Sequence, residues 1–457
     1  MDLIDKKFYF NRNNFSIYNR NGQNLFVSNK LFKWIKTQDT GMDILNKLDG
    51  ETSIRQVISE MSSEYMIPEH IVEKDVLNFC KVCLENNLIF ESNDVNDQIE
   101  YAKKLNFIYV DITNACNQKC IYCNKCVESF DDKIKHMKAS EFKSLITTLY
   151  PNEDASTVLL NITGGEPLLN PELEDILKDA AQFKFKTVLW TNGSMINEEI
   201  ADKLKKYCEY VVLSVDNFTQ EENDKIRGKG SFEKSIGAAQ ILKEKDVNFL
   251  IAVTPTIYNF ESLQNIITFI YDLGAAGFIL NEPILIKENN ESLSEHFDYD
   301  IYELNKKEKS LAKRLTIINS WKNTKLKGKE KNLVFMKDIH RCTNHPFAVR
   351  PKINCGALVN EISIGVDGKI YPCHALHIDE FSAGTVDNFV KGEFTKLSID
   401  ELDECPECMY KIFCLGGCRA KALFHTEKLK GKNPYCEIDK EMYDEFLWGP
   451  LQPVGKR

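Results

Sequence analysis

The stretch "NFIYVDITNACNQKCIYC", residues 106–123, joins an apolar run of the buried-strand type to a loop that holds three cysteines. These are Cys116, Cys120 and Cys123, and Cys126 follows them, so that four of the fifteen cysteines of the chain lie within residues 115–126. Such a concentration of thiols directly after a strand needs a chemical explanation.

The composition is that of an acidic globular protein with more than one domain. The 457 residues exceed what one hydrophobic core usually organises, and the formal net charge is −10. No basic-then-apolar signal opens the sequence, and no apolar run approaches the roughly 18 residues of a membrane span. We therefore expect a cytoplasmic protein with neither a membrane nor a nucleic-acid partner. In that reducing compartment, cysteines favour metal ligation or redox chemistry over disulfides.

From residue 106 onward, apolar runs of strand length alternate with amphipathic segments of helix length. This alternation predicts βαβ units and a parallel sheet, and six strands suit a partial (β/α)6 barrel in the α/β class better than a complete eight-stranded one. The expected strands are residues 106–113, 157–163, 186–191, 210–216, 248–254 and 277–281.

Chemically unusual residues fall directly after these strands, where the active sites of such sheets lie. Cys116, Cys120 and Cys123 follow the first strand. The residues at the ends of the second, third, fourth and sixth strands are Gly164, Gly165 and Glu166; Thr191, Asn192 and Gly193; Ser214 and Asp216; and Asn281 and Glu282. We expect all of them to point into one mouth.

Three thiolates spaced CxxxCxxC can hold three irons of a [4Fe–4S] cluster and leave the fourth iron open to substrate or cofactor. This spacing, Tyr122 before the third cysteine and the "GGEP" that begins at Gly164 together resemble the radical S-adenosylmethionine (SAM) enzymes. In that family the open iron chelates SAM, and reductive cleavage of SAM gives a 5′-deoxyadenosyl radical that abstracts hydrogen.

The resemblance implies roles for particular residues. By this resemblance, the cluster ligands are Cys116, Cys120 and Cys123. The segment Gly164, Gly165 and Glu166 would contact the amino group of SAM. The segments "SVDN" and "NDKIRGKGSF" resemble a further family run that brings Ser214 to the ribose and Arg227 to the SAM carboxylate. The other residues expected around SAM are Tyr122, Thr191, Asn192, Asp216 and Asn281.

Two other interpretations of this loop were weighed. A structural zinc knot usually completes four nitrogen or sulfur ligands, and it leaves "GGEP" unexplained. Cys126 could supply a fourth ligand, but a filled iron cannot bind SAM, so we interpret Cys126 as a neighbour of the cluster.

A second group of cysteines consists of Cys355, Cys373, Cys405, Cys408, Cys414, Cys418 and Cys436. Its order and spacing resemble the SPASM extension of radical SAM enzymes that modify peptides. That extension holds two auxiliary iron–sulfur clusters, which we expect to be of the [4Fe–4S] type. The resemblance assigns Cys355, Cys373 and Cys418 to the first of these clusters. The second cluster would be held by Cys405, Cys408, Cys414 and Cys436. The first cluster has one ligand too few. Either Cys342 completes it, or the site stays open to a substrate group. A zinc ribbon is the alternative, because paired CxxC spacings suit zinc.

Residues 1–95 form a separate unit of short strands and helices, with Thr52 or Ser53 as the N-cap of its first apolar-periodic helix. The unit resembles the leader-peptide recognition (PqqD-like) domain of enzymes that mature ribosomally made peptides, which implies a precursor peptide bound through its leader as an added strand. A winged-helix nucleic-acid module is disfavoured by a charge of −3, from 11 basic and 14 acidic residues. Cys80 and Cys83 lie on an apolar helix face, where we expect them to pack rather than ligate.

After this unit we expect a barrel domain over residues 104–283 and a connector over residues 284–340. An auxiliary-cluster domain over residues 341–440 and a tail over residues 441–457 follow. The connector is richly charged, which favours a solvated helical segment.

The resemblance implies a peptide maturase that closes an intramolecular crosslink and takes electrons from a reductant such as flavodoxin or ferredoxin. A thioether is the leading product, because an open auxiliary cluster could hold a thiolate, and a carbon–carbon bond comes second. Oxidation of Ser or Cys by a sulfatase-maturating type of enzyme and a non-enzymatic metal-binding protein are the other hypotheses. His374 and His377, beside Cys373, are candidate proton acceptors, although such histidines more often only orient ligands.

Overall fold

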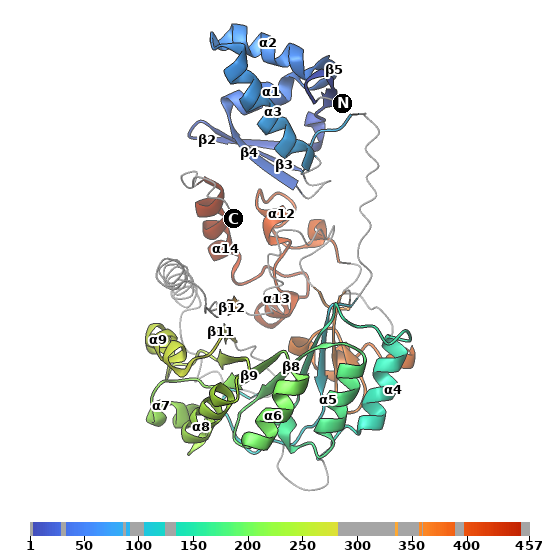
Figure 1. Cartoon of the computed structure of the whole chain (residues 1–457), viewed down its shortest axis with the longest axis vertical. Coiled ribbons are helices and arrows are strands. Elements are labelled where there is room, and N and C mark those ends of the chain that lie inside the picture. The colour runs from blue at the N-terminus through green and yellow to red at the C-terminus, as the bar shows by residue number, and fades with distance from the viewer. Residues whose placement is uncertain are drawn as a thin grey trace.

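The computed structural model describes most of the chain, and its three regions can be followed in Figure 1. The N-terminal domain lies at one end of the long axis, the barrel-type domain at the other, and the cysteine-rich C-terminal region between them. In the described part of the chain, no helix has the length and apolar character that crossing a membrane requires. The described residues are 3–28, 33–85, 88–91, 105–123, 134–281, 334–336, 356–358, 360–388 and 397–448.

The N-terminal domain packs three helices against one face of a three-stranded antiparallel sheet with the order β2-β3-β4. Ser53 caps the second helix in a reciprocal capping box with Gln56, which confirms the predicted helix start. The elements are η1 (Leu3–Asp5), β1 (Lys7–Tyr9), η2 (Arg12–Asn14), β2 (Ser16–Arg20), β3 (Gln23–Ser28), β4 (Lys33–Gln38), α1 (Asp39–Lys47), β5 (Asp49–Ser53), α2 (Ile54–Tyr65) and α3 (Glu69–Glu85).

The central sheet has nine strands in the order β12-β11-β10-β9-β8-β7-β6-β13-β14, and every neighbouring pair except β13 and β14 is parallel. All six predicted strands are present, so the α/β class with a parallel sheet is confirmed. They are β6 (Phe107–Asp111), β7 (Leu159–Thr163), β8 (Lys186–Thr191), β9 (Tyr210–Ser214), β10 (Phe249–Val253) and β11 (Gly277–Leu280).

Three further strands extend this sheet at its two edges. β12 (Val334–Met336) pairs with β11, and β13 (Glu361–Ile364) pairs with β6 and carries β14 (Ile370–Tyr371). The first of these lies within the expected helical connector, whose other residues through 340 lie outside the described part. The cysteine-rich region therefore shares a sheet with the barrel strands.

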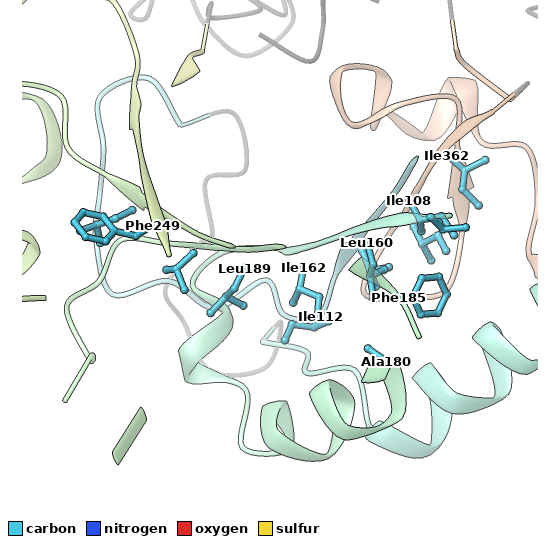
Figure 2. Packing of buried hydrophobic residues seen from close by; sticks show 14 of the residues in the cluster. Ile108, Ile112, Leu160, Ile162, Ala180, Phe185, Leu189, Phe249 and Ile362 are labelled. Carbon is cyan, nitrogen blue, oxygen red and sulfur yellow. The ribbon is translucent and has the colours of Figure 1, made fainter. Parts of the chain in front are cut away.

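Alternation along the strands decides which face meets the helices. Ile108 and Val110 of β6 join Leu160 and Ile162 of β7 in the large apolar core under the helices, which Figure 2 shows. The opposite face, called here the inner face, carries a smaller apolar cluster that includes Val188, Val212, Leu250, Ala252 and Ile279. The covering elements are α4 (Ala139–Leu149), η4 (Pro167–Leu169), α5 (Leu173–Gln182), α6 (Glu198–Tyr207), α7 (Gln220–Arg227), α8 (Ser231–Glu244), η5 (Phe260–Ser262) and α9 (Leu263–Leu273).

The C-terminal region consists of short helical turns and three helices. Residues 441–448, expected to be part of a tail, continue the last helix instead, in which Tyr443 and Leu447 pack on the N-terminal domain. The elements are η8 (His374–Leu376), η9 (Asp379–Phe381), η10 (Val386–Asn388), η12 (Ile399–Glu401), α12 (Lys411–Cys414), α13 (Arg419–Thr426) and α14 (Cys436–Trp448).

The N-terminal domain docks on this region through the face of its sheet that the helices leave free. Leu25 and Val27 of β3 pack against Tyr443 and Leu447 of α14 in a separate apolar cluster. Beside it, Arg20 Nη1 donates to both carboxylate oxygens of Asp444, at 2.6 and 2.7 Å.

Candidate active site

The cysteine loop follows β6, as predicted, and its three thiols lie together. Burial raises the pKa of Cys120 to about 11, and the guanidinium of Arg227 acts in the opposite direction. Burial raises the pKa of Cys116 too, and the thiols of Cys116 and Cys123 both influence that of Cys120. All three side chains are only half-buried, which leaves them accessible to a ligand.

The two glycines after β7 let the backbone approach the cysteine loop closely. A Cβ atom on Gly164 would lie 2.2 Å from the Thr113 carbonyl oxygen, and one on Gly165 would lie 2.1 Å from that of Ala115. The φ angle of 136° at Gly164 also favours glycine. The Gly165 N–H donates to Thr113 O at 2.8 Å, and the Glu166 N–H donates to Ala115 O at 2.7 Å. These glycines thus fix the position of the loop that carries the thiols, and their expected contact with SAM stays a prediction.

Glu166 is buried and connects two strand ends. Its carboxylate accepts hydrogen bonds from the Thr191 hydroxyl at 2.7 Å and from the Asn192 N–H at 2.8 Å. Burial raises the pKa of this carboxyl, while those two donors act in the opposite direction. The side chain therefore holds the end of β7 against the end of β8.

A second link runs from the end of β8 back to the cysteine loop. The Asn192 amide donates to Asn117 Oδ1 at 2.9 Å, and the Asn117 amide donates to Ser194 Oγ at 2.9 Å. Asn117 stands next to Cys116, so these bonds fix the loop close to the first thiol. Neither Asn117 nor Ser194 was predicted.

The most buried polar group of the site joins Asp216, Arg227 and Tyr122. Arg227 Nη1 lies 2.9 Å from Asp216 Oδ2 and also donates to the Tyr122 hydroxyl, which itself donates to Asp216 at 2.8 Å. Burial opposes the charge of Arg227, but Tyr122, Cys120 and Asp216 raise the pKa of its guanidinium well above the ordinary value. Its Nε is buried without a hydrogen-bond partner. A permanent cation thus stands beside the thiols.

One backbone donor and one side-chain donor that follow the fifth strand complete this group. The N–H of Thr254 donates to Asp216 Oδ1 at 2.6 Å, and the Asn259 amide donates to the carbonyl of Asp216 at 2.7 Å. Thr254 follows β10, so the rule that drew attention to Thr191 applies here as well, although the sequence prediction named nothing after this strand.

The remaining expected residues at strand ends are partly placed. Ser214 closes β9 and is half-buried, and Asn281 follows β11 with its N–H donating to Val253 O at 2.8 Å. Cys126 and Glu282 lie outside the described residues.

Four thiols of the C-terminal region also come together. Burial raises the pKa of Cys405, Cys414 and Cys436, and each of these thiols is influenced by at least one other member of the set. Cys408 belongs to the same group, because it acts on Cys405 and on Cys436. These are the four residues predicted to share one auxiliary cluster.

The predicted ligands of the other auxiliary cluster are only partly visible. Cys373 follows β14 and Cys418 precedes α13, and both are half-buried, while Cys342 and Cys355 lie outside the described residues. Within the described ranges, no three His, Cys, Asp or Glu side chains converge on a position for a single metal ion. The fit to iron–sulfur clusters rests on the thiol donors and on their grouping.

Comparisons with known proteins agree with this geometry. The family model "Radical SAM superfamily" matches residues 110–270, and the model "Coenzyme PQQ synthesis protein D (PqqD)" matches residues 32–89. The antilisterial bacteriocin subtilosin biosynthesis protein AlbA of Bacillus subtilis is 24% identical over 89% of each chain. An AdoMet-dependent heme synthase of Methanosarcina barkeri is 25% identical over 71% of this chain and 94% of its own. The crystal structure of Streptococcus suis SuiB bound to S-adenosylmethionine aligns with a TM-score of 0.55 at 16% identity, covering 92% of this chain and 97% of SuiB.

Proposed function

We propose that this chain, whose residues 110–270 match the radical SAM model and whose residues 32–89 match the PqqD model, is a radical SAM enzyme that matures a ribosomally made precursor peptide. The observation that carries the proposal is the PqqD domain on the same chain as the thiol loop. Among the described residues, the outer edges of β2 and β4 pair with no further strand. An extended leader peptide can add to such an edge through main-chain hydrogen bonds.

The residues present fit the cofactors that this function requires. Cys116, Cys120 and Cys123 would hold a [4Fe–4S] cluster, and Arg227 offers a buried cation with an unpaired Nε to the SAM carboxylate. When bound, the cluster and SAM supply a 5′-deoxyadenosyl radical.

Around that radical, the chain itself supplies orientation and exclusion of water. Asp216 and Tyr122 fix the guanidinium of Arg227, and Glu166 fixes the ends of β7 and β8. The side chains of Glu166, Asp216 and Arg227 are almost completely buried, so their positions are set before the substrate arrives.

The crosslink that we propose is a thioether between a cysteine sulfur and a carbon. The four grouped thiols of the C-terminal region suit one complete auxiliary cluster. Cys373 and Cys418, with Cys355, suit a second that lacks one ligand unless Cys342 completes it. An incomplete cluster could hold the substrate thiolate, and carbon–carbon bond formation is the alternative product.

The test is anaerobic co-expression with the peptide encoded by the small open reading frame nearest to the gene, followed by measurement of its exact mass. Loss of two hydrogens with one cysteine protected from alkylation supports a thioether. Loss of two hydrogens with every cysteine still alkylable moves the product to a carbon–carbon bond. No mass change in the peptide, while purified protein still forms 5′-deoxyadenosine, contradicts this peptide as substrate.

A sulfatase-maturating type of oxidation makes a different prediction. It needs no leader, so a peptide that lacks its leader would be modified as well as the complete precursor. We expect the leaderless peptide to be modified at least about tenfold less well, since its binding would lose the main-chain bonds to the sheet edge.

A further inference from the structure

Two histidine–carboxylate pairs lie at the inner face of the sheet, where the C-terminal region meets β6. Nδ1 of His374 lies 3.7 Å from Glu361 Oε1, and Nδ1 of His377 lies 3.5 Å from Asp111 Oδ2. The ring of His374 also packs on Tyr109, with 4.4 Å between centroids. The two pairs are chemically alike, so their position in the sheet must distinguish them.

The register of the strands places only one pair at the mouth. Asp111 ends β6 and lies opposite Thr163, the residue before Gly164, whereas Glu361 lies opposite Phe107 at the start of β6. Four residues of a parallel strand span about 13 Å. The Asp111 pair is therefore at the carboxyl end of the sheet, beside the glycine motif, and the Glu361 pair is at the far end.

The Asp111–His377 pair lies close in sequence to ligands of two predicted clusters. Asp111 comes five residues before Cys116, and His377 comes four residues after Cys373. The pair thus bridges the strand that leads into the cysteine loop and the segment that follows an auxiliary-cluster cysteine.

The surroundings of His377 orient its ring. Tyr371 stacks on it with 3.9 Å between centroids, and Ser363 Oγ lies 3.4 Å from Nδ1. Asp379, which accepts a hydrogen bond from Tyr371, is a second carboxylate near the ring. Asp367 lies beside Gly365 on the Nε2 side, and Lys369 pairs with both Asp367 and Asp379. Nε2 lies against Gly365, where a Cβ atom would come 3.0 Å from this nitrogen, so the absence of a side chain there lets the ring take this position. One fifth of the side chain stays exposed.

We propose that His377 accepts the proton that the substrate releases when the crosslink forms, with Asp111 as its positioning residue; the inference rests on the proposed function. Loss of two hydrogens divides into one hydrogen atom, taken by the deoxyadenosyl radical, and one proton with one electron. Formation of the bond between the two substrate atoms would release the proton to the His377 imidazole, and the auxiliary iron–sulfur cluster that the C-terminal thiols would hold would take up the electron. The Asp111 carboxylate stabilises the resulting imidazolium.

The test compares His377→Gln and Asp111→Asn with His374→Gln, the matched variant in the far pair. The measured quantity is crosslinked peptide formed per 5′-deoxyadenosine. We expect a loss on the order of 100-fold for His377→Gln and about tenfold for Asp111→Asn, with 5′-deoxyadenosine still formed. His374→Gln should stay within about twofold of the wild type. An unchanged ratio in His377→Gln would overturn the proposal.

Two further measurements separate a chemical role from a structural one. The wild-type ratio should fall at acidic pH, where imidazole is protonated, and His377→Gln should lose this dependence. The precursor peptide should also protect His377 of the wild-type protein from diethyl pyrocarbonate, a readout that needs no turnover and no variant. Absent protection contradicts the proposal even if the variants fail to fold. A wild-type enzyme that leaves the peptide mass unchanged contradicts this peptide as substrate instead.

Discussion

Two CxxC pairs of this chain, Cys80–Cys83 and Cys120–Cys123, share a spacing but differ in exposure, in backbone setting and in nearby charge. The first pair lies on α3 inside the apolar core of the N-terminal domain, fully buried, and burial raises the pKa of both thiols to about 12. The second pair lies on a loop at the end of a strand and is half-buried. The CxxC spacing alone therefore does not show whether a pair of cysteines can hold a metal.

Nearby charge distinguishes the two cysteine pairs most clearly. Cys120 has the guanidinium of Arg227 beside it, which favours the thiolate, whereas nothing that acts on Cys80 opposes the effect of burial. Because a metal binds the thiolate, the loop is prepared for ligation and the helix is not.

The largest expected effect comes from removing the loop thiols. Replacing Cys116, Cys120 and Cys123 together with Ala should abolish formation of 5′-deoxyadenosine, because no other group can generate the radical. Replacing Cys80 and Cys83 with Ala is the matched control and should leave it intact. Chromatography of reconstituted protein incubated with SAM and dithionite measures both, and 5′-deoxyadenosine from the loop variant would refute the cluster assignment.

Removing the charge of Arg227 should bring the pKa of the loop thiols closer to that of Cys80 and Cys83 on the helix. Arg227→Met leaves Asp216 buried without its cation, which should cost about 3–5 kcal/mol of unfolding free energy. It should also raise the pKa of Cys120 further, so that alkylation of the cluster-free protein slows. Lys225→Met removes an exposed cation on the same helix and should leave the denaturant midpoint nearly unchanged. Equal denaturant midpoints for the two variants would contradict this account.

Cys414 is an intermediate case, because the docked N-terminal domain helps to bury it. It packs in the cluster that Leu25 and Leu447 form across the interface, and burial raises the pKa of its thiol. Leu25→Asp should separate the domains, expose this thiol and speed its alkylation by about tenfold at pH 8, since exposure lowers the pKa. Peptide mapping of the cluster-free protein measures the rate.

The control for this variant is Arg20→Ala. Its ion pair with Asp444 is substantially exposed, with 49% and 35% of the side chains accessible, so its loss should change stability by less than about 1 kcal/mol. A Leu25→Asp protein with the alkylation rate of Arg20→Ala would contradict a tight interface.

The sequence was sufficient for everything that repeats along the chain. The six buried strands, the N-cap at Ser53 and the apolar face that holds Cys80 and Cys83 all follow from periodicity and capping. The polar residues after the strands follow from a second rule, which places the active site of a parallel sheet at the carboxyl ends of its strands. Thr254 satisfies this rule as well, although it was not predicted.

The missed features depend on long-range pairing. β12, β13 and β14 have two to four residues each, too few to show a period, and they are strands only because β6 and β11 offer them edges. The docking of Arg20 on Asp444 joins residues 424 positions apart. The position of His377 beside Asp111 likewise becomes visible only once β13 pairs with β6.

The smallest effect concerns the helix thiols themselves, and it depends on pH. The pKa of Cys80 is about 12 in the folded domain against an ordinary 9, so the buried thiol favours folding fully below pH 9. As the pH rises from 9 towards 12, the unfolded chain ionises first, and this contribution should be lost by about 1.4 kcal/mol per pH unit.

Cys80→Val, which keeps the apolar volume, should remove that alkaline loss while changing the unfolding free energy by less than about 1.5 kcal/mol at pH 7. Thermal unfolding at pH 7 and pH 10, followed by circular dichroism of cluster-free protein, compares the variant with the wild type. Equal alkaline sensitivity would mean that Cys80 ionises in the folded domain as easily as in the unfolded chain. The thiols on the helix would then differ from those of the loop by backbone geometry alone, and the role assigned here to nearby charge would have to be given up.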